Sequence, residues 1–171
     1  MSVIDAVRRK PIAWPALLGS ILLCELAGIV PSVLTAGDVA TWYPTLAKPG
    51  FTPPSWLFGP VWTTLYLLMG VALYLVWRGG GTNRETSRIR RFALGAFGVQ
   101  LLLNASWTLV FFGSREIFGG LVVIVALLAA ILATMWASVR VDRRAAILLV
   151  PYLAWVGFAT LLNYEIWRLN A

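Results

Sequence analysis

Five long stretches of the sequence hold almost no charge, and this feature limits the possible folds more than any other. Four of them are uncharged throughout, and a fifth is interrupted only by Glu25; they cover residues 11–36, 56–77, 92–114, 117–139 and 145–164. A helix needs about 20 apolar residues to cross the hydrocarbon core of a bilayer. Only 12% of the residues are charged, which is roughly half the share in soluble domains. The sequence predicts an all-α integral membrane protein, a five-transmembrane-helix bundle that forms a single membrane domain over residues 1–171, with spans near residues 12–35, 56–77, 92–113, 117–139 and 145–167.

Basic residues are distributed unequally between the two ends of these spans. Eleven of the 14 Lys and Arg residues fall at the N-terminus and in the second and fourth loops, and the other three are Lys48, Arg115 and Arg168. Cytoplasmic loops carry the excess of Lys and Arg in membrane proteins. We therefore expect a cytoplasmic N-terminus and an external C-terminus in a bacterial cytoplasmic membrane, with an outer membrane as the alternative. The net charge of +7 then reflects topology and lipid headgroups, and nucleic-acid binding is not expected.

The sequence also lacks the side chains that several kinds of chemistry need. It contains no His and a single Cys, Cys24. This excludes imidazole metal ligands, axial His ligation of haem, a His general base and a disulfide framework. No acid–base pair or activated nucleophile is visible, so hydrolytic or transfer chemistry is not expected. We expect no metal site and no required cofactor.

A loop rich in Pro and Trp, at residues 36–55, joins the first two predicted helices. Its prolines fix φ and lack an N–H, so the segment before Ser55 is predicted not to form regular helix; they are Pro44, Pro49, Pro53 and Pro54. Long loops in compact folds are usually functional or disordered, and the aromatic content argues against disorder. The loop is predicted to be a rigid lid over an apolar ligand.

Two predicted helices carry polar and aromatic residues along one face. On the third helix these are Gln100, Asn104, Trp107 and Phe111, and on the fifth they are Tyr152, Trp155, Ala159 and Leu162. At a rise of about 1.5 Å per residue, these faces and Trp62 of the second helix meet in the half of the membrane beneath the loop. Amides in hydrocarbon need partners, so the stripe should face the interior. A pocket that opens toward the loop is predicted; the alternative is that the amides are interhelical hydrogen-bond partners and Ala159 a close-packing site.

Glu25 is the acid that lies well inside a predicted span. A carboxyl group at that depth is expected to be a ligand contact or a protonatable switch. The alternative is a neutral carboxyl group paired with a hydroxyl or an amide.

Several separate motifs in this sequence occur in the order typical of one membrane family. They are Trp42-Tyr43, Lys48-Pro49, Pro53-Pro54, the segment from Gly59 to Tyr66, Gln100 with Leu103-Asn104 and Trp107, Phe111-Phe112-Gly113, and the run from Pro151 to Asn170. With them the chain resembles the TspO/MBR family (tryptophan-rich sensory protein, translocator protein, peripheral benzodiazepine receptor) from about residue 19 to 170. The resemblance implies a five-helix bundle, often a homodimer, which binds porphyrins and benzodiazepine-type ligands in a pocket closed by the first loop.

The resemblance also implies site residues, and they largely coincide with those that the spacing brings together. Two residues are added from the spacing: Tyr66, one turn from Trp62, and Phe111, on the polar and aromatic face of the third helix. The predicted ligand-binding set is then Trp42, Tyr43, Trp62, Tyr66, Asn104, Trp107, Phe111, Trp155 and Ala159. Two of them, Trp62 and Trp155, match tryptophans that some bacterial members use in light-dependent breakdown of protoporphyrin. A cholesterol-contact pattern of animal members is matched by Leu162, Tyr164 and Arg168.

These features predict a membrane protein that binds a porphyrin of the protoporphyrin IX type and acts in porphyrin sensing, sequestration or transport. A flat macrocycle would stack on Trp62 and Trp155, with edge contacts from Asn104. The partners expected are the porphyrin, the bilayer and a second copy of the chain. Two alternatives are a light-dependent porphyrin-degrading enzyme, with Trp62 and Trp155 as its catalytic residues, and a sterol or lipid transporter.

Overall fold

The computed structural model describes residues 11–79 and 84–171, and all its regular elements there are helices. In chain order they are α2 (Trp14–Leu34), α3 (Ala36–Thr41), η1 (Tyr43–Thr45), α4 (Ser55–Arg78), α5 (Arg84–Thr108), η2 (Leu109–Gly113), α6 (Ile117–Val141), α7 (Arg143–Leu148) and α8 (Val150–Asn170). Five segments are long and apolar enough to cross a membrane: Trp14–Leu34, Ser55–Arg78, Arg84–Gly113, Ile117–Val141 and Arg143–Asn170. The predicted all-α fold is confirmed, and the protein is an integral membrane protein with five membrane-spanning helices.

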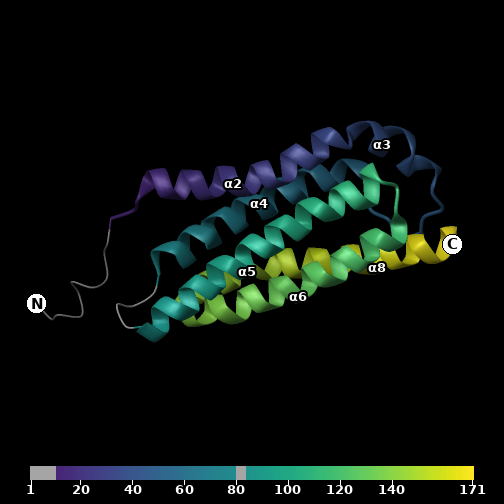
Figure 1. The fold of residues 1–171 in the computed structure, drawn as a ribbon. Helices are drawn as coiled ribbons and strands as arrows, with labels where there is room; N and C mark the ends of the chain where they lie inside the picture. The colour runs from purple at the N-terminus through teal and green to yellow at the C-terminus, as the bar shows by residue number, and fades with distance from the viewer. Residues whose placement is uncertain (1–10, 80–83) are drawn as a thin grey trace, which may run out of the picture.

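The long helices lie side by side in one elongated bundle, with α3 and the C-terminus at the same end (Figure 1). We call this the lid end, because the connection between α2 and α4, named the lid below, lies there. Neighbour relations close the helices into a ring: α2 packs on α4 and α5, α5 packs on α6, α6 packs on α8, and α4 meets α7 and α8. Consequently α5 and α8 face each other across the interior of the ring, where the candidate site lies.

The distribution of side chains is typical of a membrane protein, with apolar side chains outside and polar side chains inside. Large apolar side chains cover the outside, and those of Trp56 and Leu102 are each 71% exposed. Polar side chains are buried instead, with Gln100, Asn104 and Asn163 each 1% exposed. Lipid tails are as apolar as Leu, so outward apolar groups lose nothing there, whereas polar groups need partners inside the protein.

The third span differs at both ends from an ordinary apolar helix. It begins at Arg84, well before the apolar run at residue 92, because Arg and Glu are good helix formers and continue the helix beyond the hydrocarbon. It ends in the π-helical turn η2, where the Ser114 N–H donates to the Leu109 carbonyl at 2.8 Å. Such turns add a residue to the helix and often occur at functional sites. Here the π-turn contains Phe111 and Phe112, and both of their rings contact the ring of Trp107.

The connection between α2 and α4 is partly helical. The prediction of no regular helix before Ser55 is wrong for α3 at Ala36–Thr41, because the first proline after α2 is Pro44 and nothing earlier removes a hydrogen-bond donor. Beyond η1 the chain has no regular structure until α4 begins at Ser55. We call residues 36–54 the lid.

Glycine allows α2 and α4 to approach closely. A Cβ at Gly28 of α2 would overlap the ring of Tyr66 on α4, and a Cβ at Gly70 of α4 would overlap the backbone of Ile21 on α2. Small residues at helix contacts let backbones approach in membranes, where packing drives association. Gly28 thereby leaves the space in which Tyr66 turns toward the interior.

Candidate ligand-binding site

A buried hydrogen-bond network joins three helices at the centre of the ring. The phenol of Tyr66 on α4 donates to Asn104 Oδ1 on α5 at 2.5 Å, and Asn104 Nδ2 donates to the phenol oxygen of Tyr152 on α8 at 3.0 Å. Asn104 is 1% exposed and Tyr152 is fully buried. Both halves of the Asn104 amide are thus paired within the protein, as the interhelical alternative expects.

Aromatic rings pack against this network on its lid side. Trp62, one turn before Tyr66, stacks on the Tyr66 ring with centroids 5.4 Å apart and meets the Tyr152 ring edge-on at 6.3 Å. On the facing helix, Trp155 packs against Phe58 at 5.8 Å and against Phe158 of its own helix at 5.6 Å. Aromatic rings therefore pack against one another in stacked and edge-on pairs in the interior beneath the lid.

A second aromatic group lies closer to the lid, around the π-turn. Trp107 stacks on Phe111 with centroids 5.5 Å apart, and its Nε1 donates to Asn163 Oδ1 on α8 at 3.1 Å. Asn163 Nδ2 in turn donates to the Ile117 carbonyl at the start of α6 at 3.0 Å. This network orients Trp107 and ties α5, α6 and α8 together at the lid end.

The lid lies on that second group through its own aromatic residues. Trp42 meets Phe111 edge-on at 5.8 Å, and Tyr43 meets Phe112 at 5.5 Å. The ammonium group of Lys48 lies 4.6 Å from the centroid of the Tyr43 ring, which is cation–π range. Burial raises the pKa of the Tyr43 phenol above its usual value, so this phenol remains neutral across the physiological range.

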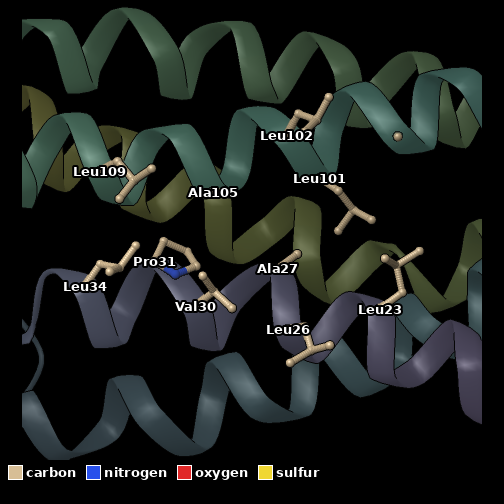
Figure 2. Close-up of a pocket in the computed structure, with 11 residues that line it drawn as sticks. Leu23, Leu26, Ala27, Val30, Pro31, Leu34, Leu101, Leu102, Ala105 and Leu109 are labelled. Atoms are coloured by element: carbon tan, nitrogen blue, oxygen red, sulfur yellow. The ribbon is translucent and has the colours of Figure 1, made fainter.

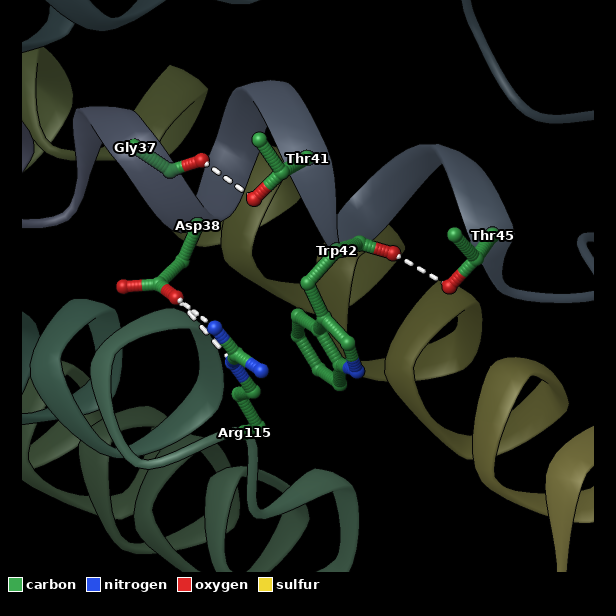
Figure 3. Close-up of polar contacts among 6 residues, drawn as sticks. All are labelled: Gly37, Asp38, Thr41, Trp42, Thr45 and Arg115. Carbon is green, nitrogen blue, oxygen red and sulfur yellow. Dashed lines mark hydrogen bonds and ion pairs between the residues drawn. The ribbon is translucent and has the colours of Figure 1, made fainter.

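Polar contacts hold the lid at two places, near its start and beyond its middle. Asp38 of α3 accepts two hydrogen bonds from the Arg115 guanidinium, the shorter at 2.7 Å (Figure 3). Arg115 has a φ of 58°, in the left-handed region that non-glycine residues seldom occupy. Beyond the middle of the lid, Asn170 of α8 exchanges a pair of hydrogen bonds with the Ala47 backbone at 2.9 and 3.0 Å. The lid is therefore bound to the turn between α5 and α6 and to the C-terminal end of α8.

Buried side-chain polar atoms without a hydrogen-bond partner occur in four of the described residues: Arg90, Gln100, Ser138 and Trp155. Of these, Trp155 is the one that belongs to the predicted ligand-binding set. Trp155 stands beside Ala159, a small residue that is 8% exposed. Buried polar groups are nearly always hydrogen-bonded in native proteins, so the Trp155 N–H is the point of the predicted set at which an acceptor atom of a ligand would gain most.

The structure brings all nine predicted ligand-binding residues together. One cluster contains Trp62, Tyr66, Trp107, Trp155 and Ala159, with Asn104 bonded to it through Tyr66, and an adjoining cluster contains Trp42, Tyr43, Trp107 and Phe111. The two clusters share Trp107. Their ligand-binding role stays a prediction, because what the geometry provides is their proximity.

Three residues of the site were missed by the sequence reasoning: Phe58, Phe158 and Asn163. Asn163 carried a usable signal, since an amide within an apolar run needs a partner inside the bundle. The two phenylalanines carried none, because Phe faces lipid as readily as it faces a core.

The remaining candidates do not join these clusters as a group. Of the sterol pattern, Leu162 is buried, whereas Tyr164 is 42% exposed and Arg168 forms an exposed ion pair with Glu165 at 2.7 Å; the three do not share one surface. Glu25 is half-buried near the middle of α2, and no hydrogen bond or ion pair to it is found within residues 11–79 and 84–171.

Two hollows on the molecule lie away from these clusters. An apolar groove of about 430 Å³ runs between α2 and α5 on the outside of the ring, with Leu26 and Pro31 on one side and Leu102 and Leu109 on the other (Figure 2). A smaller hollow of about 260 Å³ lies between α4 and the start of α8, beside Pro60 and Pro151. Neither hollow is lined by a residue of the predicted set, and beneath the lid the rings of that set contact one another.

Comparison with known proteins gives consistent matches over nearly the whole chain. The model of the TspO/MBR family matches residues 20–168. A tryptophan-rich protein TspO of Archaeoglobus fulgidus is 44% identical over 155 residues, which cover 91% of this chain and 97% of the relative. The human translocator protein is 41% identical over 157 residues, 92% of this chain and 91% of the relative. A tryptophan-rich sensory protein of Cereibacter sphaeroides is 36% identical over 157 residues, 92% of each chain.

Proposed function

The chain belongs to the TspO/MBR family, and from this membership and the site geometry we propose that it binds a porphyrin inside the helix ring. The porphyrin lies beneath the lid, between the walls formed by α4, α5 and α8. Binding of this kind serves porphyrin sensing, sequestration or transport in the membrane. It requires no further cofactor.

The observation that carries this proposal is the unpaired indole N–H of Trp155. Its Nε1 is buried and without a partner among the described residues, while its ring contacts those of Phe58 and Phe158. An aromatic face with one free donor suits a flat, largely apolar ligand that carries an acceptor. A porphyrin provides both the π-face and the acceptor.

Entry of the ligand requires the interior rings to separate. Trp62 stacks on Tyr66 in the ligand-free protein. A macrocycle that stacks on Trp62 replaces this ring contact by a larger stacking contact. Asn104 already has both of its groups paired, so it supports the site by fixing Tyr66 and Tyr152. The lid must also open, and its exposed fastenings at Asp38 and Asn170 are the contacts that break.

Quenching of tryptophan fluorescence by protoporphyrin in detergent, under dim light, tests this proposal. We expect saturable quenching at micromolar concentrations, weakened several-fold by Trp155→Phe, by Trp62→Phe and by Asn104→Ala. Trp136→Phe is the matched control, because Trp136 is 56% exposed on the lipid side of α6. Quenching that is not saturable, or that all four variants change alike, would contradict a site in the ring.

Light-dependent porphyrin breakdown is the second candidate, and one arrangement favours it. Trp62 stacks on Tyr66, whose phenol donates to Asn104, so an oxidised indole has a second oxidisable ring in direct contact. Illumination of the quenched samples tests the idea. Bleaching that disappears in a Trp62→Phe or Trp155→Phe variant which still binds porphyrin supports an enzyme, and equal bleaching in both variants refutes it.

We propose the membrane placement on the charge bias alone. An N-terminus in the cytoplasm and a lid end outside, in a bacterial cytoplasmic membrane, follow from the positive-inside rule. Reporter fusions at the two termini test it, with opposite compartments expected. A homodimer remains a further proposal, which the mass of the detergent-solubilised protein by light scattering would test.

A further inference from the structure

The lid end of the bundle carries three basic side chains, and two of them already pair with an acid. Arg115 donates two hydrogen bonds to Asp38 (Figure 3), and Arg168 forms an ion pair with Glu165. Lys48 of the lid forms no ion pair within residues 11–79 and 84–171. It is therefore the lid-end cation whose charge the described chain leaves without a countercharge.

The ammonium group of Lys48 is held in a fixed place on the lid. It donates to the Leu46 carbonyl at 3.1 Å and lies 4.6 Å from the centroid of the Tyr43 ring. The preceding residue, Ala47, is itself bonded to Asn170 of α8. An ammonium group has three N–H donors, and among the described residues one of them has a partner. The other two are available to an acceptor on a ligand.

The segment that carries Lys48 packs on both aromatic groups of the candidate site. Before it in the chain, Tyr43 meets Phe112 edge-on at 5.5 Å, and after it Phe51 meets Phe158 of α8 at 6.3 Å. Phe112 belongs to the group around the π-turn, and Phe158 belongs to the group next to the buried hydrogen-bond network. The half-buried Lys48 thus lies on the rim of the site and not on a detached loop.

The interior beneath the lid offers no countercharge to an ionised ligand group. All the buried polar side chains of the described residues are uncharged, and an unpaired carboxylate is very costly to bury in such surroundings. A porphyrin of the protoporphyrin type has two propionate groups side by side on one edge and an apolar opposite edge. Its carboxylates are therefore best placed at the rim, where water and a cation are within reach.

We propose that the ammonium group of Lys48 binds a propionate carboxylate of the porphyrin, so that the carboxylate edge of the ligand lies at the lid and its apolar edge points into the ring. The inference rests on the proposed function and deepens it, because it names the class of porphyrin and its orientation. An ammonium–carboxylate hydrogen bond is stronger than a neutral one, and partial burial of the pair reduces its screening by salt. The pair also joins the lid directly to the ligand.

Three porphyrins with closely similar macrocycles test this contact on the full-length protein in an uncharged detergent at pH 8, by quenching of tryptophan fluorescence. Mesoporphyrin has two ionised carboxylates, its dimethyl ester has none, and etioporphyrin has neither carboxylate nor ester. We expect Lys48→Met to weaken mesoporphyrin binding about tenfold, as the loss of one charged hydrogen bond predicts, and to leave the other two unchanged. Lys48→Arg should retain most of the mesoporphyrin affinity, because it keeps the charge.

The matched control is Arg143→Gln, which removes one positive charge from an exposed residue of α7, at the end of the bundle opposite the lid. It should change the binding of none of the three porphyrins. A loss of mesoporphyrin affinity equal to that of Lys48→Met would show that net charge attracts the ligand, and this would overturn the assignment to Lys48.

The remaining outcomes separate this contact from the function it rests on. Saturable binding of all three porphyrins with no effect of Lys48→Met overturns the contact and leaves porphyrin binding in place. An equal loss for all three overturns it as well, because Lys48 would then act only by holding the lid against Tyr43. If Lys48→Met does not fold, Lys48→Gln replaces it. Absence of saturable binding of every porphyrin in the unaltered protein overturns both proposals.

Discussion

The bonds from Asn104 to Tyr66 and Tyr152 should couple α4, α5 and α8 energetically. Asn104→Ala removes both bonds and leaves two buried phenols without their partner. Interhelical hydrogen bonds in membranes contribute about 0.6 kcal/mol on average and about 1.7 kcal/mol at most. Two of them give a loss of about 1 to 3 kcal/mol in the free energy of unfolding. The upper half of this range applies here, because Asn104 and Tyr152 are at most 1% exposed and no water replaces the lost partner.

A double-mutant cycle isolates the pairwise contribution. Unfolding of the purified protein by SDS in mixed micelles, followed by helicity, gives the free energies for Asn104→Ala, Tyr66→Phe and the double variant. We expect a coupling energy of about 1 kcal/mol, since the second change has no bond left to remove. A parallel cycle with Tyr164→Phe should show none, because Tyr164 lies on the outside of α8 and is 42% exposed.

Additivity of Asn104→Ala and Tyr66→Phe within about 0.5 kcal/mol would refute the reasoning. It would mean that the amide is not held by the phenol in the ligand-free protein. Asn104 would then be free to contact a ligand directly, and its assignment as a supporting residue would be withdrawn.

Three further changes probe the helix contact, the lid and the short turn between α6 and α7. Gly28→Ala places a Cβ against the Tyr66 ring and should destabilise by about 1 to 3 kcal/mol, so an unchanged melting temperature in detergent would contradict the close contact. Asp38→Asn breaks the ion pair with Arg115, which is 56% exposed on the Arg side; we expect less than about 1 kcal/mol of lost stability but faster porphyrin dissociation by stopped-flow quenching, and an unchanged rate would mean that this pair does not hold the lid. The hydrogen bond from a nearby guanidinium lowers the pKa of Asp142 below its usual value, so its stabilising effect is present at neutral pH and is lost as the pH falls through that lowered pKa. Asp142→Ala should therefore lower stability by about 1 kcal/mol at pH 7 and by little near pH 2, as thermal unfolding at the two pH values would show.

Much of the architecture could be predicted from the sequence because membrane insertion is decided segment by segment. Each uncharged run carries its own transfer free energy, which depends on length and composition and not on neighbours. The five spans and the family were therefore accessible, and both are confirmed. The ends of the helices were predicted less well from the residue pattern. The helix α3 forms before the first proline of the lid, and α5 extends through a charged segment to Arg84.

The sequence predicted which residues belong to the candidate site, but it did not predict which of them pair with one another. Helical spacing places Gln100 and Asn104 on one face, and nothing in that spacing distinguishes them. The tertiary structure separates them, because Tyr66 and Tyr152 from other helices reach Asn104, while Gln100 has no partner in the described chain. The π-turn that brings Phe111 beside Trp107 has no signature in the residue pattern either.

The sequence by itself thus determined which segments lie in the membrane and which of their faces are polar or aromatic. The tertiary structure alone decided the order of helices in the ring, which buried amides have partners, and the contact between residues as distant as Asp38 and Arg115. The physical reason is that burial in lipid acts on each helix separately. Hydrogen bonds and ring contacts between helices depend on the position of both partners, which only packing fixes.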